Sequence, residues 1–123
     1  MNIKVATSQF VTIKNDFESN LNKAIKLIED AAKENVDILL LQELFLDNYF
    51  CSTKNDKFFN LAIEFPSNAM FEKLSNICKN KNISLPISFF QKDDGKYFNS
   101  LVMIDSNGKY SEVYNKSHIP EGI

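Results

Sequence analysis

Hydrophobic residues follow two kinds of spacing in the first third of the chain, and together they predict a mixed α/β fold. Residues 3–10 are mostly short, apolar or β-tolerant, which is typical of a strand. Residues 16–35 place apolar side chains, from Phe17 to Ala32, on one face at helical spacing. The unbroken apolar run Ile38–Leu41 then predicts a strand that is buried on both faces. Strand, helix and buried strand in this order predict a βαβ unit with two parallel strands.

The ends of the predicted helix carry residues that can satisfy its unpaired backbone groups. Asn15 is the expected N-cap, and Glu18, three residues later, is its expected partner in a capping box. Asn35 can adopt the left-handed conformation that commonly ends a helix. The charged residues between these ends fall on the opposite face, which we expect to be exposed to solvent.

The rest of the chain predicts helices followed by three consecutive strands. Residues 54–63 predict a short helix, and Pro66-Ser67 marks the start of a longer one whose apolar stripe includes Cys78. Cys78 is therefore expected to be a small core side chain. The three strands are predicted over residues 83–90, 97–104 and 109–115. Pro86 lies inside the first of them, where it either weakens the evidence for the strand or marks a break.

Composition and charge exclude several classes of protein. All 14 basic residues are lysine, against 16 acidic residues, so the net charge is −2. Without a basic stripe the chain has no electrostatic footprint for nucleic acid. Its longest aliphatic runs are far shorter than the roughly twenty apolar residues of a membrane-spanning helix. Two cysteines, one histidine and no visible signal peptide favour a reduced, cytoplasmic protein without a zinc site.

Candidate chemistry lies where two predicted strands end. Gln42-Glu43 directly follows the Ile38–Leu41 strand, and Lys116 to His118 follow the last strand. Ligands of open α/β sheets bind beyond the carboxyl ends of the strands. If these two strands are parallel, a carboxylate and an ammonium meet at one edge, where they can transfer a proton and stabilise an oxyanion. A structural ion pair at a strand end is the alternative.

Three longer stretches resemble the nitrilase superfamily of carbon–nitrogen hydrolases. They are LLLQELFLDNYFCS, LPISFFQK and YFNSLVMIDSNGKYSEVYNKSHIPEG. They occur in the family's order, and the resemblance extends from the first strand to the last residue. It implies the N-terminal portion of a four-layer α-β-β-α sandwich, in which a mixed sheet has helices on one face. It also implies a Glu–Lys–Cys catalytic triad that needs no cofactor and no metal.

The resemblance also assigns roles to single residues. Glu43, in the QELF segment, matches the general base, and Lys116 matches the lysine that stabilises the tetrahedral intermediate. His118 matches a histidine that supports the pocket, although a structural histidine at a strand end is an equally open interpretation. Asn99 matches a supporting or structural asparagine, and Tyr49 is expected beside the substrate.

The same resemblance places the family's nucleophilic cysteine beyond Ile123, so residues 1–123 correspond to the N-terminal part of one hydrolase domain. Cys51 matches a cysteine that is not the nucleophile and lies near the pocket at most. Without a thiolate no thioester can form, and we expect the chain alone to be inactive. The second sheet of the sandwich would also be missing, which would leave one sheet face bare and apolar. We therefore expect the chain to be oligomeric or poorly soluble.

Two functions remain open at this point. One is a carbon–nitrogen hydrolase that acts on a small-molecule amide or carbamoyl substrate, with no nucleic acid or membrane partner, as a homo-oligomer. The other is a non-catalytic, truncated nitrilase-like module that acts in assembly or ligand binding. An unrelated small α/β domain, with Glu43 and Lys116 in structural roles, is disfavoured because the matched motifs are long and ordered.

Overall fold

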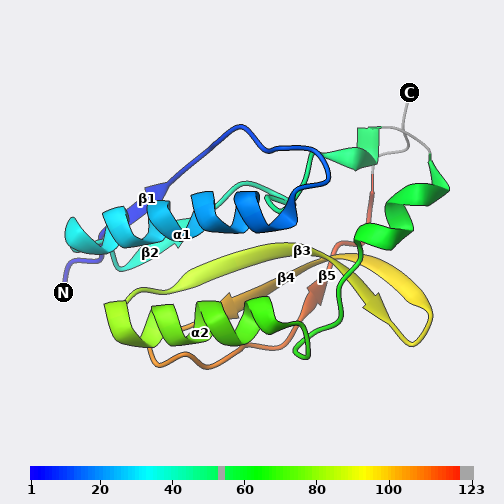
Figure 1. Cartoon of the computed structure of the whole chain (residues 1–123). Coiled ribbons are helices and arrows are strands. Elements are labelled where there is room, and N and C mark those ends of the chain that lie inside the picture. The colour runs from blue at the N-terminus through cyan, green and yellow to red at the C-terminus, as the bar shows by residue number, and fades with distance from the viewer. Residues whose placement is uncertain (53–54, 120–123) are drawn as a thin grey trace.

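Strands and helices alternate in the first part of the structure, and an antiparallel hairpin dominates the second part (Figure 1). The computed structural model describes residues 1–52 and 55–119. Its elements are, in chain order, β1 (Val5–Thr7), α1 (Phe17–Lys33), β2 (Ile38–Leu40), the 3₁₀ helices η1 (Phe50–Ser52) and η2 (Asp56–Leu61), α2 (Ala69–Lys81), β3 (Leu85–Asp93), β4 (Lys96–Ile104) and β5 (Tyr114–Asn115). This order confirms the predicted mixed α/β class.

Two hydrogen-bonded ladders make up the sheet. In the first, β1 is parallel to β2, as the βαβ pattern predicts. In the second, β3 is antiparallel to β4 and β4 is antiparallel to β5. A single parallel bridge between Ile38 and Ser84 joins the two ladders, so the strand order is β1-β2-β3-β4-β5. Two reversals after β3 make β5 parallel to β2, and the carboxyl ends of β2 and β5 therefore point in the same direction.

The first helix begins one residue later than the predicted cap. The Asp16 carboxylate, not Asn15, accepts the hydrogen bond from the Ser19 backbone N–H, at 3.0 Å. Asn15 has a φ of 58° and donates its own N–H to Asp47, so its left-handed backbone turns the chain into the helix. The predicted left-handed conformation of Asn35, at the other end, is confirmed by its φ of 57°.

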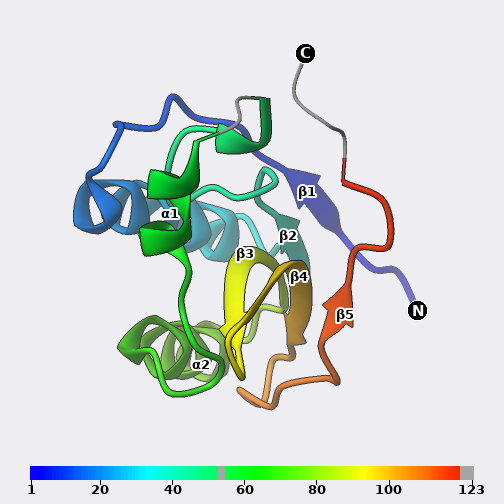
Figure 2. The same cartoon turned by 90° about the vertical axis from the view of Figure 1, so that its right-hand side faces the viewer.

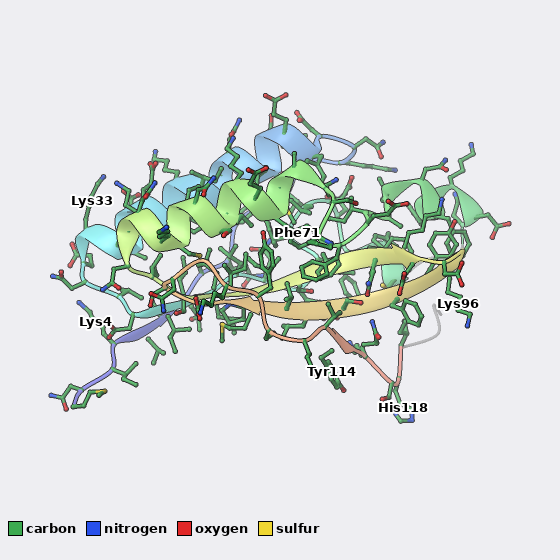
Figure 3. The ribbon with its side chains drawn as sticks, turned by 90° about the horizontal axis from the view of Figure 1, so that it is seen from below. Lys4, Lys33, Phe71, Lys96, Tyr114 and His118 are labelled. Carbon is green, nitrogen blue, oxygen red and sulfur yellow. The ribbon has the colours of Figure 1, made fainter. Side chains whose placement is uncertain are left out.

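The prediction that the Ile38–Leu41 strand is buried on both faces is wrong. Leu39 is buried in the core, but Leu40, on the opposite face of β2, is 43% exposed. The physical reason is that α1 and α2 lie on the same side of the sheet (Figure 3). The alternation of side chains along a strand therefore sends Leu39 under the helices and Leu40 away from them.

The core forms where α2 packs on the β3–β4 hairpin. Its fully buried aromatic pair, Phe71 and Phe89, has ring centroids 4.9 Å apart in an edge-to-face arrangement. Cys78 is fully buried on the same helix face, which confirms it as a core residue, and burial raises the pKa of its thiol to about 12. Asn68 caps α2 by accepting from the Met70 N–H.

Other parts of the connections differ from the predicted helices. The segment predicted as a short helix over residues 54–63 forms the 3₁₀ helix η2, and Lys54 lies outside the described residues. Within the described part of the chain, no helix combines the length and apolar character needed to cross a bilayer.

Pro86 does not break its strand, so the predicted strand continues through it. It lies inside β3 and pairs with Met103 of β4. Two residues earlier, Ser84 donates to Asp37 and accepts from Leu39, so the backbone groups at this spacing face β2. The nitrogen of Pro86 has the same orientation but carries no hydrogen. The hydrogen bond that Pro86 cannot donate is therefore missing between β2 and β3, and the pairing of these strands is limited to one bridge.

The last strand is much shorter than the prediction of residues 109–115. Pairing with β4 is interrupted around Ser111, where the backbone N–H of Met103 donates to the Ser111 hydroxyl instead of a carbonyl. Serine side chains compete with the backbone for hydrogen bonds in this way. Regular pairing resumes only at Tyr114 and Asn115.

The sheet face opposite the helices carries exposed apolar side chains. We call this the open face, and it contains Val5, Leu40, Leu101 and Tyr114. The parallel register places Val5 and Leu40 on one side of β1 and β2, and Leu101 pairs directly with Tyr114. Apolar surface of this kind is favourable to bury against another apolar surface.

We expect the 123-residue chain to associate through the open face. In sedimentation analysis it should appear as dimers or larger species, and the double variant Val5→Lys/Leu101→Lys should shift it toward a monomer. Val11→Lys, which changes an even more exposed valine in the loop after β1, is the matched control and should leave association unchanged. A monodisperse parent monomer that melts cooperatively would contradict this expectation.

Candidate active site

An ion pair joins two segments that are far apart in the sequence. Glu43 follows β2 and Lys116 follows β5, and the Lys116 Nζ lies 2.9 Å from the Glu43 Oε1. The two side chains are 35% and 42% exposed for Lys116 and Glu43, respectively, so the pair is open to solvent on one side. It forms because β2 and β5 are parallel and end at the same edge of the sheet.

Asn99 connects both members of this pair. The buried side-chain amide of Asn99 donates from Nδ2 to the Glu43 Oε1 at 2.7 Å. The backbone carbonyl of Asn99 accepts the backbone N–H of Lys116 at 2.8 Å. Both side-chain hydrogen bonds therefore end on the same carboxylate oxygen. Within residues 1–52 and 55–119, no hydrogen bond to the second oxygen, Oε2, is found. Oε2 is therefore the oxygen available to accept a proton.

The residues on either side of Glu43 fix its backbone. The Gln42 side-chain amide bonds to both backbone groups of Phe10, accepting at 2.9 Å and donating at 2.6 Å. Leu44 has a φ of 53° and donates its N–H to the Ser88 hydroxyl at 3.0 Å. A left-handed leucine costs about 1–2 kcal/mol, which the burial of Leu44 and Phe45 offsets. The sharp turn after β2 is thus held from both sides.

The ion pair lines an open groove of about 1020 Å³ on the same side of the sheet as the open face. Its described walls contain no charged side chain besides the pair, and most of the others are hydroxyls, amides and leucines. The lining residues are Thr7, Ser8, Gln9, Leu40, Leu41, Gln42, Glu43, Ser88, Asn99, Ser100, Leu101, Tyr114 and Lys116. A groove of this composition suits a small polar ligand.

The pair shifts the protonation equilibria of both its members. Burial is the largest single effect on Glu43 and raises its pKa, but the hydrogen bonds from Lys116 and Asn99 and the charge of Lys116 outweigh burial, so the pKa is lowered overall. The hydrogen bond to Glu43 raises the pKa of Lys116, partly opposed by desolvation. Both groups are therefore charged at neutral pH, and Glu43 can accept a proton.

Tyr49 and Cys51 lie close enough to Glu43 and Lys116 for these charges to shift their pKa values, but neither residue lines the groove. Partial burial, and then the negative charge of Glu43, raise the pKa of the Tyr49 hydroxyl. The same two causes, in the same order, raise the pKa of the Cys51 thiol. Cys51 is therefore protonated at neutral pH, in keeping with the prediction that it is not a nucleophile.

His118 is exposed and also lies outside the groove lining. Figure 3 shows its side chain beyond Tyr114, pointing away from the rest of the described chain. Its supporting role, like the catalytic roles of Glu43 and Lys116, stays a prediction. Within the described residues, no cluster of three or more histidine, cysteine, aspartate or glutamate side chains is placed to hold a metal ion.

Several polar residues of the site were not predicted from the sequence. Ser88 accepts the Leu44 N–H, and a polar cluster links the buried Gln91 and Ser100 to the exposed Asn115, which directly precedes Lys116. The available signal was a serine directly between the apolar residues Ile87 and Phe89 of the predicted strand. A polar residue inside an apolar strand needs a hydrogen-bond partner, and the partner reveals its role.

The fold and the site together define a mixed α/β protein with a Glu–Lys pair at the carboxyl ends of parallel strands. The sequence profile of the carbon-nitrogen hydrolase family matches residues 4–123. The chain belongs to this carbon–nitrogen hydrolase family.

Curated relatives and solved structures agree with this assignment. The chain is 33% identical over 120 residues to N-carbamoylputrescine amidase from Solanum lycopersicum, covering 98% of the chain and 40% of that protein. It is 40% identical over 122 residues to citrullinase from Francisella tularensis subsp. tularensis, covering 99% of the chain and 42% of that protein. The crystal structure of a carbon-nitrogen hydrolase from Helicobacter pylori G27 superposes with a TM-score of 0.84 at 30% identity, over 96% of this chain and 40% of that one. The chain thus spans about two-fifths of the relatives it matches.

Replacing Glu43 by glutamine should change how stability depends on pH. Because the folded-state pKa of Glu43 lies below its ordinary value of 4.5, its contribution is present above that value and is lost as pH falls through the folded pKa. For a half-exposed pair this contribution is below about 1 kcal/mol at pH 7. Urea unfolding at pH 7 should show the parent as the more stable protein, and the difference should shrink toward pH 3.

Glu29→Gln is the matched control, since Glu29 is exposed on α1 and distant from the groove. It should not show the same loss between the two pH values. A Glu43→Gln variant whose stability relative to the parent is the same at both pH values would contradict the assigned pKa direction.

Proposed function

We propose that this chain supplies the base and the cation of a carbon–nitrogen hydrolase that cleaves a terminal ureido group, R–NH–CO–NH₂. Our first candidate substrate is N-carbamoylputrescine, which would yield putrescine, carbon dioxide and ammonia, a reaction of polyamine biosynthesis. The observation that carries the proposal is the Glu43–Lys116 pair at the groove, in a chain of this family. The curated relatives add support, because N-carbamoylputrescine and citrulline both end in a ureido group.

In the proposed mechanism, the nucleophile is a cysteine outside residues 1–123. Glu43 takes the thiol proton as the sulfur attacks the ureido carbonyl, and the Lys116 ammonium stabilises the resulting oxyanion. Glu43 returns the proton to the departing nitrogen, and ammonia leaves behind a thiocarbamate. Water, deprotonated by Glu43, then releases the cysteine and a carbamate, which decomposes to carbon dioxide and the amine. No metal or redox cofactor takes part in these steps.

The two cysteines of this chain are poor candidates for the nucleophile. Cys78 is fully buried under the helices with a pKa of about 12, and partial burial together with the charge of Glu43 raises the pKa of Cys51. A reactive cysteine needs the opposite environment, with a lowered pKa and access to the substrate. This supports a nucleophile from outside the present sequence.

N-carbamoylputrescine and citrulline differ in the charges that they carry away from the ureido group. The two molecules share the ureido end, but citrulline also carries a carboxylate, which needs a cation in its binding site. The sequence contains no arginine, and the one described cation at the groove, Lys116, is already paired with Glu43. N-carbamoylputrescine carries an ammonium, which needs an anion, and Glu43, the one described anion at the groove, is paired as well. The described walls therefore do not separate the two substrates.

The alternative, a non-catalytic module for assembly or ligand binding, has less support. An assembly surface does not need a carboxylate whose two hydrogen bonds converge on one oxygen and leave the other free. The open face on its own fits either function, so the ion pair is the feature that separates the two.

Activity is to be tested in a protein that carries residues 1–123 together with the rest of the family domain. Ammonia release from N-carbamoylputrescine should fall by about 10²–10⁴-fold in Glu43→Gln, since a general base contributes on this order. Glu29→Gln should keep full activity. Substantial turnover by Glu43→Gln would remove Glu43 from the role of base, and the 123-residue chain alone should release no ammonia.

A further inference from the structure

Lys116 depends on a strand that is too short to hold it by backbone pairing alone. β5 contains only Tyr114 and Asn115, and beyond it a single backbone hydrogen bond ties Lys116 to Asn99. A two-residue strand at the edge of a sheet frays easily, because few hydrogen bonds oppose its conformational entropy. The position of the Lys116 ammonium therefore requires another anchor.

A closed triangle of side-chain hydrogen bonds provides this anchor at the preceding residue. The Asn115 Nδ2 donates to the Gln91 Oε1 at 3.0 Å and to the Ser100 Oγ at 2.8 Å. The Ser100 hydroxyl donates in turn to the same Gln91 oxygen at 2.7 Å. An amide nitrogen has two hydrogens and a carbonyl oxygen has two lone pairs, so all the bonds of the triangle can exist together.

The side chains of the triangle lie on the helix-facing side of the sheet, although Ser100 is also one of the residues that line the groove. Gln91 and Ser100 are buried, and they share the helix-facing side of β3 and β4 with Phe89. Asn115 pairs directly with Ser100, so its side chain is on that side as well. The next residue, Lys116, then faces the groove because side chains alternate along the chain. The side chains of Asn115 and Lys116 thus form hydrogen bonds on opposite faces of the sheet.

We propose that Asn115 is a positioning residue, and that its triangle with Gln91 and Ser100 holds β5 so that the Lys116 ammonium reaches the Glu43 carboxylate. Two of the three members, Gln91 and Ser100, are buried, and Asn115 is exposed at the edge of the sheet. The exposed Asn115 is held because its amide satisfies these two buried polar groups, which would be costly to leave without partners. The inference rests on the proposed function only in calling Lys116 the cation of the reaction. The geometry itself can be tested without turnover.

The test compares Asn115→Ala with the parent chain by NMR, using ¹³C-labelled glutamate and lysine to follow the titration of Glu43 and Lys116. Losing the anchor should return the Glu43 pKa most of the way up to its ordinary 4.5 and the Lys116 pKa down toward 10.5. Asn22→Ala, which changes an exposed asparagine on α1, is the matched control and should leave both titrations unchanged. A loss of global stability alone does not move these values while the protein is folded.

Ser100→Ala removes the triangle from the β4 side without altering β5, and it should shift both titrations in the same direction. It also decides the question if Asn115→Ala does not fold. Parent-like titrations of Glu43 and Lys116 in these variants would overturn the positioning role.

In the complete enzyme, Asn115→Ala should lower kcat on the order of 10–100-fold with little change in KM, as misplacement of a catalytic group does. Shifted titrations in a protein that hydrolyses no ureido compound would sustain the positioning role and reject the proposed function. Parent-like titrations in an active enzyme would do the reverse.

Discussion

One carboxylate oxygen organises the site. The Glu43 Oε1 receives the Lys116 ammonium and the Asn99 amide, and through them it connects the turn after β2, the middle of β4 and the residue after β5. These three segments are distant in the sequence, and each has its own support behind it: Gln42 and Ser88 at the first, the β3–β4 ladder at the second and Asn115 at the third. Two charged groups in contact hold one geometry only when their backbones are fixed, because the pair itself is partly exposed and contributes little stability.

The parts of the fold that depend on local sequence were predictable. The helical spacing of residues 16–35, the left-handed Asn35 and the buried Cys78 follow from side-chain periodicity and turn chemistry, and the structure confirms them. The contact of Glu43 with Lys116 was predictable only on the condition that β2 and β5 are parallel. The structure meets that condition, whereas the roles of the two residues in catalysis stay predictions.

The predictions that failed depended on groups far away in the chain. Leu40 is exposed because both helices cover the same side of the sheet, which no local pattern reveals. The last strand is short because the hydroxyl of Ser111 competes for the Met103 N–H, and Asp16 replaces Asn15 as the cap because Asp47 binds the Asn15 N–H. The triangle of Gln91, Ser100 and Asn115 is likewise invisible in the sequence, since it needs three strands in register.

Pro86 affects how the strands that carry Glu43 and Lys116 are joined. Because it leaves one bridge between β2 and β3, the strands form two separately paired groups, β1-β2 and β3-β4-β5. Figure 2 shows the five strands that make up these groups. Glu43 belongs to the group built from β1 and β2, and Lys116 belongs to the group built from β3, β4 and β5. The acid and the cation therefore belong to separately paired groups of strands, and the hydrogen bond from the Leu44 N–H to the Ser88 hydroxyl ties the turn that carries Glu43 to β3. This bond joins the two groups directly beside the pair.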